Sequence, residues 1–310
     1  MLYRGCLVPN NPKRQHHITP RVYLEGFASK EQPTVVYVFE KARGPRPLPI
    51  PVTGVQKDYY AVTRDDGTKD TQTVEDYLAH EIESPANPII RKIRDRQMPE
   101  ASEKLVLARY ISAMMTRVPQ HRARQRKTTK TVAEQEKAKW QEAIDQAIVE
   151  NPAMEEKLQR LRFEALRHID KFSSDPPDSL FANSIMDADK YASKIHNMKW
   201  VFFITKTRQG FITSDNPVFF FESIGLVGRD DYEGYGEISF PISREIALWA
   251  SWQQKEERFL LVNEHLVREI NNRTASTAQR YLYYSTSARW VDALAKRNKE
   301  DIHLNRIILS

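Results

Sequence analysis

Cysteine is almost missing from this sequence, since Cys6 is the only one among 310 residues. A single cysteine cannot form an intramolecular disulfide, and it cannot supply the two or more thiolates of a cysteine-based zinc site. The sequence therefore excludes a disulfide-stabilised scaffold. A reducing cytoplasm is the compartment that we expect for such a chain.

Long apolar runs are missing as well. The longest runs, such as residues 200–204, are far shorter than the roughly 20 apolar residues of a membrane helix. The first residues contain no apolar stretch of signal-peptide length. Hydrophobic residues make up 40% and charged residues 28% of the chain, and the mean hydropathy is −0.61. We expect a globular protein rich in solvated helix, with no membrane partner.

The common sequence motifs of catalysis are also absent. The chain has no glycine-rich phosphate loop ending in Gly-Lys-Ser/Thr, no dinucleotide fingerprint, no His-Glu-x-x-His pair and no Gly-x-Ser-x-Gly elbow. ATP-binding, dinucleotide-binding and α/β-hydrolase functions lose most of their support.

Positive charge is concentrated in one segment. Lys and Arg total 47 against 41 Asp and Glu, which gives a net charge of +6. Residues 117–139 hold eight basic and two acidic side chains, so this segment carries as much net charge as the whole chain. Such a stretch indicates binding of nucleic acid or another polyanion, although a solvated helix face or a mobile helical arm is the commoner explanation of a charge run. The candidate phosphate-binding residues are Arg122, Arg124, Arg126, Lys127 and Lys130.

Hydrophobic patterning predicts an α+β fold in one domain over residues 1–310. Residues 1–96 read as a mixed α/β cap, 100–196 as a helical region, and 198–310 as a mainly antiparallel β-rich region. Asn151-Pro152 interrupts the helical region, and the basic segment 117–139 has few apolar residues, so we expect it to project as a helical arm.

Within the cap, Thr19-Pro20 predicts a helix start, and Tyr23, Leu24 and Phe27 its buried face. The other elements expected in the cap are strands at 35–39 and 58–62 and helices at 73–83 and 87–96. The four prolines of residues 44–51 argue against regular structure there.

In the β-rich region we expect a hairpin that pairs residues 200–205 with 211–213, and a flexible glycine-rich loop at 225–236. The remaining elements expected are strands at 238–242, 246–252, 280–285 and 302–309, and helices at 262–278 and 288–297.

A scattered set of polar residues is the candidate catalytic site. Its members are His17, Glu83, Arg117, Asp215 and Asn216. Carboxylates and imidazoles together suit a divalent metal ion that activates water, with His17, Glu83 and Asp215 as tentative ligands. Each residue also has a structural interpretation: a histidine before a helix bonds backbone, Glu83 and the nearby Glu75 pair with basic neighbours, and Asp215 before Asn216-Pro217 forms a turn.

Several stretches resemble the bacterial family known as domain of unknown function 4238. They are His16–Ala28 with the following strand, Val74–Ala86, Ala113–Pro119, Phe211–Val218, Phe240–Ser243, and Asn271-Asn272 with Tyr281–Ser285. The resemblance spans about residues 16–285, and the family name assigns no activity. The family's motif positions correspond here to His17, Pro20, Tyr23, Leu24, Phe27, Glu75, Glu83, Arg117, Pro119, Asp215, Asn216, Pro217 and Asn272. The long basic insertion after Pro119 looks peripheral to the family pattern.

Two hypotheses for function follow. The first is a metal-assisted, nuclease-like hydrolase acting on nucleic acid or a nucleotide, in which Arg117 clamps phosphate and Asn216 orients the substrate. Its concrete form is an effector of phage defence, a role that rests on no residue. The second is a non-catalytic module whose basic arm binds nucleic acid or a protein partner.

Overall fold

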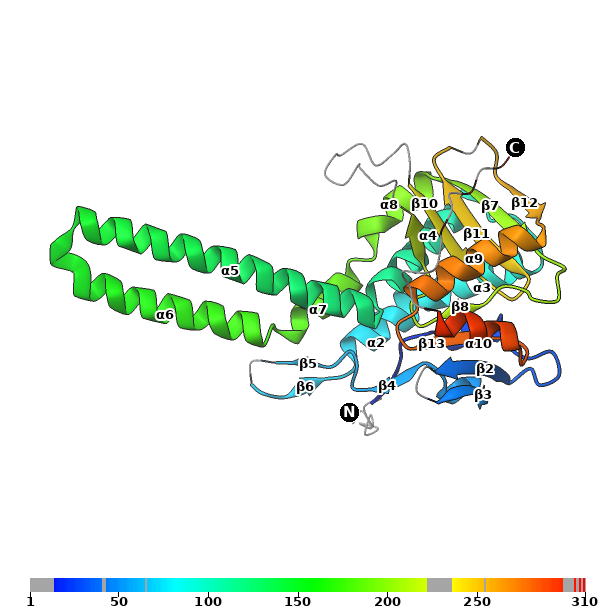
Figure 1. Ribbon diagram of the computed structural model, residues 1–310, viewed down its shortest axis with the longest axis horizontal. Coiled ribbons are helices and arrows are strands. Elements are labelled where there is room, and N and C mark those ends of the chain that lie inside the picture. The colour runs from blue at the N-terminus through cyan, green and yellow to red at the C-terminus, as the bar shows by residue number, and fades with distance from the viewer. Residues whose placement is uncertain are drawn as a thin grey trace, which may run out of the picture.

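The computed structural model describes residues 14–40, 43–64, 66–221, 236–253 and 255–297, with Leu304, Ile307 and Leu309. Apart from single residues, the loop expected at 225–236 and the strand expected at 302–309 lie outside these ranges. The structure combines helices with mainly antiparallel sheets, so the predicted α+β fold is confirmed (Figure 1). Across the described ranges, we find no helix with the length and apolarity that crossing a membrane would require.

The expected helical region is confirmed over its whole length. Leu107, Tyr110, Ile111 and Met114 of its first helix are buried in the main core, where they contact the apolar faces of the cap and of the β-rich region. The helices are α4 (Ala101–Thr116), α5 (Pro119–Glu150), α6 (Glu155–Ser174), α7 (Asp178–Met186) and α8 (Asp189–Asn197).

Helices α5 and α6 form an antiparallel hairpin that projects far from the body (Figure 1). The expected break at Asn151-Pro152 is confirmed, because a short 3-10 turn, η3 (Pro152–Met154), reverses the chain there. Only Ala133 and Ile144 of α5 are buried, and no residue of α6 is. The arm is therefore a two-helix structure with most of its surface in solvent. It begins at Pro119 rather than at residue 117, because Arg117 caps α4 inside the body.

A five-stranded sheet forms the centre of the β-rich region. Its order is β12-β7-β11-β10-β9, with β12 and β7 parallel and the other neighbours antiparallel. Helix α9 packs against it and is followed by α10. These elements are β7 (Lys199–Ile204), β9 (Phe219–Phe221), β10 (Glu237–Pro241), β11 (Ile246–Ser251), β12 (Arg258–Leu261), α9 (Glu264–Thr277) and α10 (Arg289–Lys296).

The predicted hairpin of residues 200–205 with 211–213 is wrong. Strand β7 pairs with β11 on one side and β12 on the other, whereas Thr213-Ser214 forms β8 in a different sheet. Residues 200–203 are all buried, so β7 is apolar on both faces. A strand of that kind is typical of a central position with a partner on each side, and a hairpin with residues 211–213 would supply a partner on one side only.

A four-stranded sheet combines strands from the cap with strands from the β-rich region. Its order is β3-β2-β13-β8, so the cap and the β-rich region share one sheet. Phe39, Leu282 and Tyr284 on one face pack with residues of α9 and α10. Val36, Val38 and Tyr283 on the other face belong to the main core. The strands are β2 (Val35–Glu40), β3 (Gly44–Pro49), β8 (Thr213–Ser214) and β13 (Tyr281–Tyr284).

Strand β3 corrects the expectation that residues 44–51 lack regular structure. It pairs with β2 over its six residues as an edge strand. Pro45, Pro47 and Pro49 occupy alternate positions, and alternate residues of an antiparallel edge strand direct their backbone N–H away from the partner. No bond to β2 is lost, because only the residues between the prolines donate to it.

The cap contains short elements around a long helix. The short helix after Pro20 is confirmed, with Tyr23, Leu24 and Phe27 fully buried. The strand expected at 58–62 is wrong, because Asp58 has a positive φ of 53° and residues 58–60 form a turn after β4. The elements are β1 (Gln15–His17), α1 (Arg21–Glu25), η1 (Ile50–Val52), β4 (Val55–Lys57), β5 (Val62–Thr63) and β6 (Lys69–Asp70).

The two helices expected at 73–83 and 87–96 form one continuous helical segment. A π-helical stretch, η2 (Leu78–Glu83), joins α2 (Thr73–Tyr77) to α3 (Ser84–Arg94). Pro85 and Pro88 lack the N–H that would continue the regular α-helical bonding, which explains why the pattern changes here. This π-helical stretch ends at Glu83, one of the candidate site residues.

Candidate functional site

Arg117 is the centre of a buried polar cluster between α4 and the cap. Its side chain is 1% exposed, and its Nη1 donates to Glu83 Oε1 at 2.6 Å. Its Nε donates to the hydroxyl of Tyr60 at 3.0 Å, and its Nη2 donates to the backbone oxygen of His17 at 2.5 Å. Desolvation alone would lower the pKa of Arg117, but Tyr60 and Glu83 outweigh it and raise the pKa. The guanidinium is therefore permanently charged and has a partner on three of its nitrogens.

His17 takes part in this cluster mainly through its backbone. Its carbonyl oxygen accepts from Arg117 and also from the hydroxyl of Tyr60, at 3.3 Å. Its half-buried ring lies 3.3 Å from the carbonyl oxygen of Pro51, measured from Nε2. Burial lowers the pKa of the imidazole, so the neutral form is favoured. The structural interpretation of a histidine before a helix, a bond to backbone, describes this ring.

Asp215 and Asn216 form a second cluster, where β8 ends. Asp215 is 5% exposed, and its two oxygens accept from the backbone amides of Gln279 and Arg280, both at 2.8 Å, and of Tyr281 at 3.3 Å. Burial raises the pKa of Asp215, although the three amide bonds act in the opposite direction. The side chain fixes the start of β13 rather than a turn at its own position.

Asn216 connects this cluster to the arm. Its amide nitrogen donates to the side chain of Gln120 in the first turn of α5 and to the carbonyl oxygen of Thr277 at 3.1 Å. Because Arg117 lies three residues before Gln120, the chain from 117 to 120 joins the two clusters. The five residues of the candidate catalytic site thus form two neighbouring clusters, held mostly by bonds within the protein.

The three tentative metal ligands, His17, Glu83 and Asp215, do not gather into one cation site. Within the ranges that the structure covers, no group of three or more His, Cys, Asp or Glu side chains is arranged to hold a metal ion. Glu83 forms an ion pair with Arg117, and Asp215 accepts hydrogen bonds from three backbone amides.

A cleft of about 460 Å³ lies beside Asp215, and we name it the Asp215 cleft. It opens between one face of the four-stranded sheet and the segment that contains η1 and β4. His17, Glu83 and Arg117 are not part of its wall. Its lining residues are Ile18, Thr19, Val38, Arg46, Leu48, Val52, Thr53, Gly54, Val55, Gln56, Pro119, Asp215, Gln279, Arg280, Tyr281 and Tyr283.

The five candidate phosphate-binding residues of α5 are not equivalent. Arg122 is committed to the body, because Nη2 donates to Asp178 Oδ1 at 2.9 Å and the guanidinium lies over the rings of Tyr59 and Phe181. The other four are exposed, and none of them joins an ion pair with the described residues. We name them the arm-base patch: Arg124, Arg126, Lys127 and Lys130.

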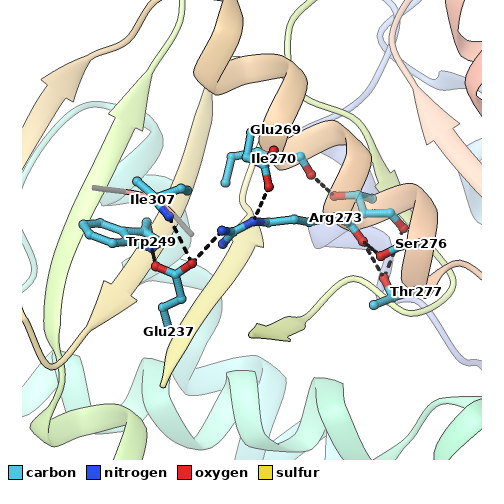
Figure 2. Close-up of polar contacts among 9 residues, drawn as sticks. Glu237, Trp249, Glu269, Ile270, Arg273, Ser276, Thr277 and Ile307 are labelled. Carbon is cyan, nitrogen blue, oxygen red and sulfur yellow. Dashed lines mark hydrogen bonds and ion pairs between the residues drawn. The ribbon is translucent and has the colours of Figure 1, made fainter. Parts of the chain in front are cut away.

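A buried ionic network in the β-rich region, shown in Figure 2, was not among the sequence-based predictions. Arg273 of α9 is completely buried, and its Nη2 donates to Glu237 Oε1 at 2.5 Å. Its Nε donates to Glu269 Oε1 at 3.1 Å, and the indole nitrogen of Trp249 donates to the other oxygen of Glu237 at 2.8 Å. One sequence signal was available: Glu269 and Arg273 lie four residues apart in α9, beside the apolar Val267 and Ile270.

Comparison with known proteins identifies a family but no activity. A family described as Protein of unknown function (DUF4238) matches residues 15–288. No curated protein and no solved structure matches the chain.

Proposed function

We propose that this chain, which belongs to the DUF4238 family, binds nucleic acid in the cytoplasm by contacting the phosphate backbone with its arm-base patch. The observation that carries the proposal is the patch itself, four exposed cations without an ion-pair partner among the described residues. The single cysteine supports the reducing compartment.

The placement of the patch on α5 suits contact with a phosphate backbone. Arg124, Lys127 and Lys130 recur every three residues, so their side chains lie on neighbouring parts of one helix surface over about 9 Å of helix axis. Arg126 and Lys130 are four residues apart, so they also lie next to each other on the helix surface. The rest of α5 differs in charge, because residues 131–150 hold two basic and five acidic side chains. Contact with a polyanion is therefore expected at the base of the arm and not along its length.

Neutralising the patch is expected to abolish most of this binding. Replacing Arg124, Arg126, Lys127 and Lys130 with glutamine should weaken binding to a labelled DNA duplex roughly 100-fold at low salt. The slope of log affinity against log salt should shrink by about 0.9 for each phosphate that the variant no longer neutralises. Fluorescence anisotropy titrations at several salt concentrations measure both quantities.

Four exposed cations on α6 offer a matched control. Replacing Lys157, Arg160, Arg167 and Lys171 with glutamine removes the same charge from the same arm but leaves the patch intact. Equal losses in the two variants would show that only general charge matters, and an affinity independent of salt would contradict the proposal outright.

A metal-assisted hydrolase stays a prediction, and one observation favours it. Asp215, whose pKa burial raises, lines the Asp215 cleft, and such a group in a cleft is a candidate acid or base. If labelled DNA or RNA is cleaved with Mg²⁺ or Mn²⁺, Asp215→Asn and Glu83→Gln should each lower the rate about 100-fold or more while circular dichroism stays unchanged. Undiminished cleavage by both folded variants, or no cleavage by the native chain, would refute this function.

A further inference from the structure

The Asp215 cleft has one charged end that a buried carboxylate organises. Glu40 is 1% exposed and follows Val38 on the same face of β2. Its Oε1 accepts from Arg280 Nη2 at 2.6 Å, and its Oε2 accepts from Arg46 Nη2 at 2.7 Å. The Arg280 guanidinium, together with Arg46, holds the pKa of Glu40 below its usual range. Two guanidinium groups in the wall of the cleft are thus held in place by one ionised carboxylate.

Two arginines, Arg46 and Arg280, belong to the wall at this end. Arg43, 67% exposed and outside the wall, also approaches the Glu40 carboxylate, at 3.9 Å. Asp215 contributes a carboxylate to the wall itself, and its oxygens are occupied by three backbone amides. Nη1 of Arg280 and both Nε and Nη1 of Arg46 make no hydrogen bond with the described residues. These donors are available to an anionic group.

The rest of the cleft is aromatic and apolar, with two amides at its edge. The rings of Tyr281 and Tyr283 lie 6.1 Å apart at an interplanar angle of 20°. Val38 and Leu48 belong to the same wall, and so do Gln56 and Gln279, which can bond to polar ring edges. A volume of about 460 Å³ is much larger than one inorganic anion needs, and it falls within the range of about 300–1,000 Å³ typical of small-molecule sites.

We propose that the Asp215 cleft binds a nucleoside monophosphate. The phosphate lies against Arg46 and Arg280. The base lies against the accessible part of the wall, which Tyr281, Leu48 and Val52 provide, with its polar edge at the glutamines. A guanidinium matches phosphate geometry through parallel donors, and aromatic rings favour stacked planar groups. The inference is independent of the arm, because no residue of the arm-base patch lines the cleft.

Calorimetric titration of the full chain with adenosine 5′-monophosphate tests the proposal. We expect saturable binding of one molecule per chain, and binding of adenosine that is at least about tenfold weaker, because a charged hydrogen-bonding partner is removed. Arg280→Gln and Arg46→Gln should each weaken binding of the monophosphate about tenfold. Arg280 is 61% exposed in its side chain, so its replacement is not expected to prevent folding.

Arg43→Gln is the matched control. It removes an arginine that also pairs with Glu40 but does not line the cleft. It should leave binding of the monophosphate unchanged, and so should the arm-base variant, whereas Arg280→Gln should leave duplex binding unchanged. These comparisons show whether the proposal for the cleft or the proposal for the arm is wrong. Adenosine binding as tightly as the monophosphate, an Arg43 variant as impaired as the Arg280 variant, or no binding at all would overturn the proposal.

Discussion

Replacing Arg273 with methionine is expected to lower the free energy of unfolding by about 3–5 kcal/mol, the usual cost of removing one partner from a buried ion network. Arg273 and Glu237 are both fully buried, and Glu269 is 6% exposed in its side chain. Methionine would fill much of the space but would leave two buried carboxylates without the guanidinium that they share. The rings of Phe219 and Phe221, which lie 5.1 and 5.5 Å from its central carbon, would lose their cation as well. Equilibrium unfolding in urea measures the change.

A triple variant separates the effect of the missing charge from the effect of poorer packing. Arg273→Met combined with Glu237→Gln and Glu269→Gln removes all three charges, and neutral replacement of a whole buried network costs little in many proteins. We expect it to recover a large part of the stability lost in the single variant. If the triple variant is less stable than Arg273→Met alone, the carboxylates are not the source of the destabilisation.

Replacing Arg117 with methionine is expected to cost about 3 kcal/mol or more in unfolding free energy. The change leaves Glu83, the Tyr60 hydroxyl and the backbone oxygen of His17 without a shared donor in the interior. It is measured by the same urea titration. In contrast, Arg160→Met removes an exposed pair with Glu156 on α6 and should change stability by no more than about 0.5 kcal/mol.

The Arg117 result also bears on the clamp that the sequence suggested. A phosphate clamp needs donors that a substrate can reach, and the Arg117 side chain is 1% exposed. A large stability loss with unchanged nucleic-acid affinity would assign Arg117 to the architecture of the cap. A stable variant with weakened phosphate binding would support the clamp.

Local patterns predicted those helices and turns that a few neighbouring residues determine. The stripe of Tyr23, Leu24 and Phe27 marked the buried face of α1, and Asn151-Pro152 marked the turn of the arm, because side-chain spacing and backbone donors decide both. Pairing between strands was harder to predict. The partners of β7 lie 42 to 57 positions further along the chain, and no pattern within the strand encodes them.

In the candidate site, too, the sequence predicted some features, and others depend on the folded structure. The sequence singled out Arg117 and Asp215, and both are buried polar residues with several bonds. It could not reveal that Asp215 accepts from three backbone amides or that Arg117 donates to the backbone oxygen of His17, because a backbone atom has no identity in a sequence. Glu237 and Arg273 escaped attention because 36 residues separate them, so their ion pair exists only after β10 and α9 have packed.

The alternate prolines of β3 have a consequence for the behaviour of whole molecules in concentrated solution. The free edge of an ordinary sheet offers a row of donors and acceptors, to which a strand from another molecule can add. At this edge Pro45, Pro47 and Pro49 occupy the outward positions, so an approaching strand meets carbonyl oxygens without a matching N–H. The sequence thereby closes this border of the sheet to growth into fibres, although β2 and β3 pair along six residues.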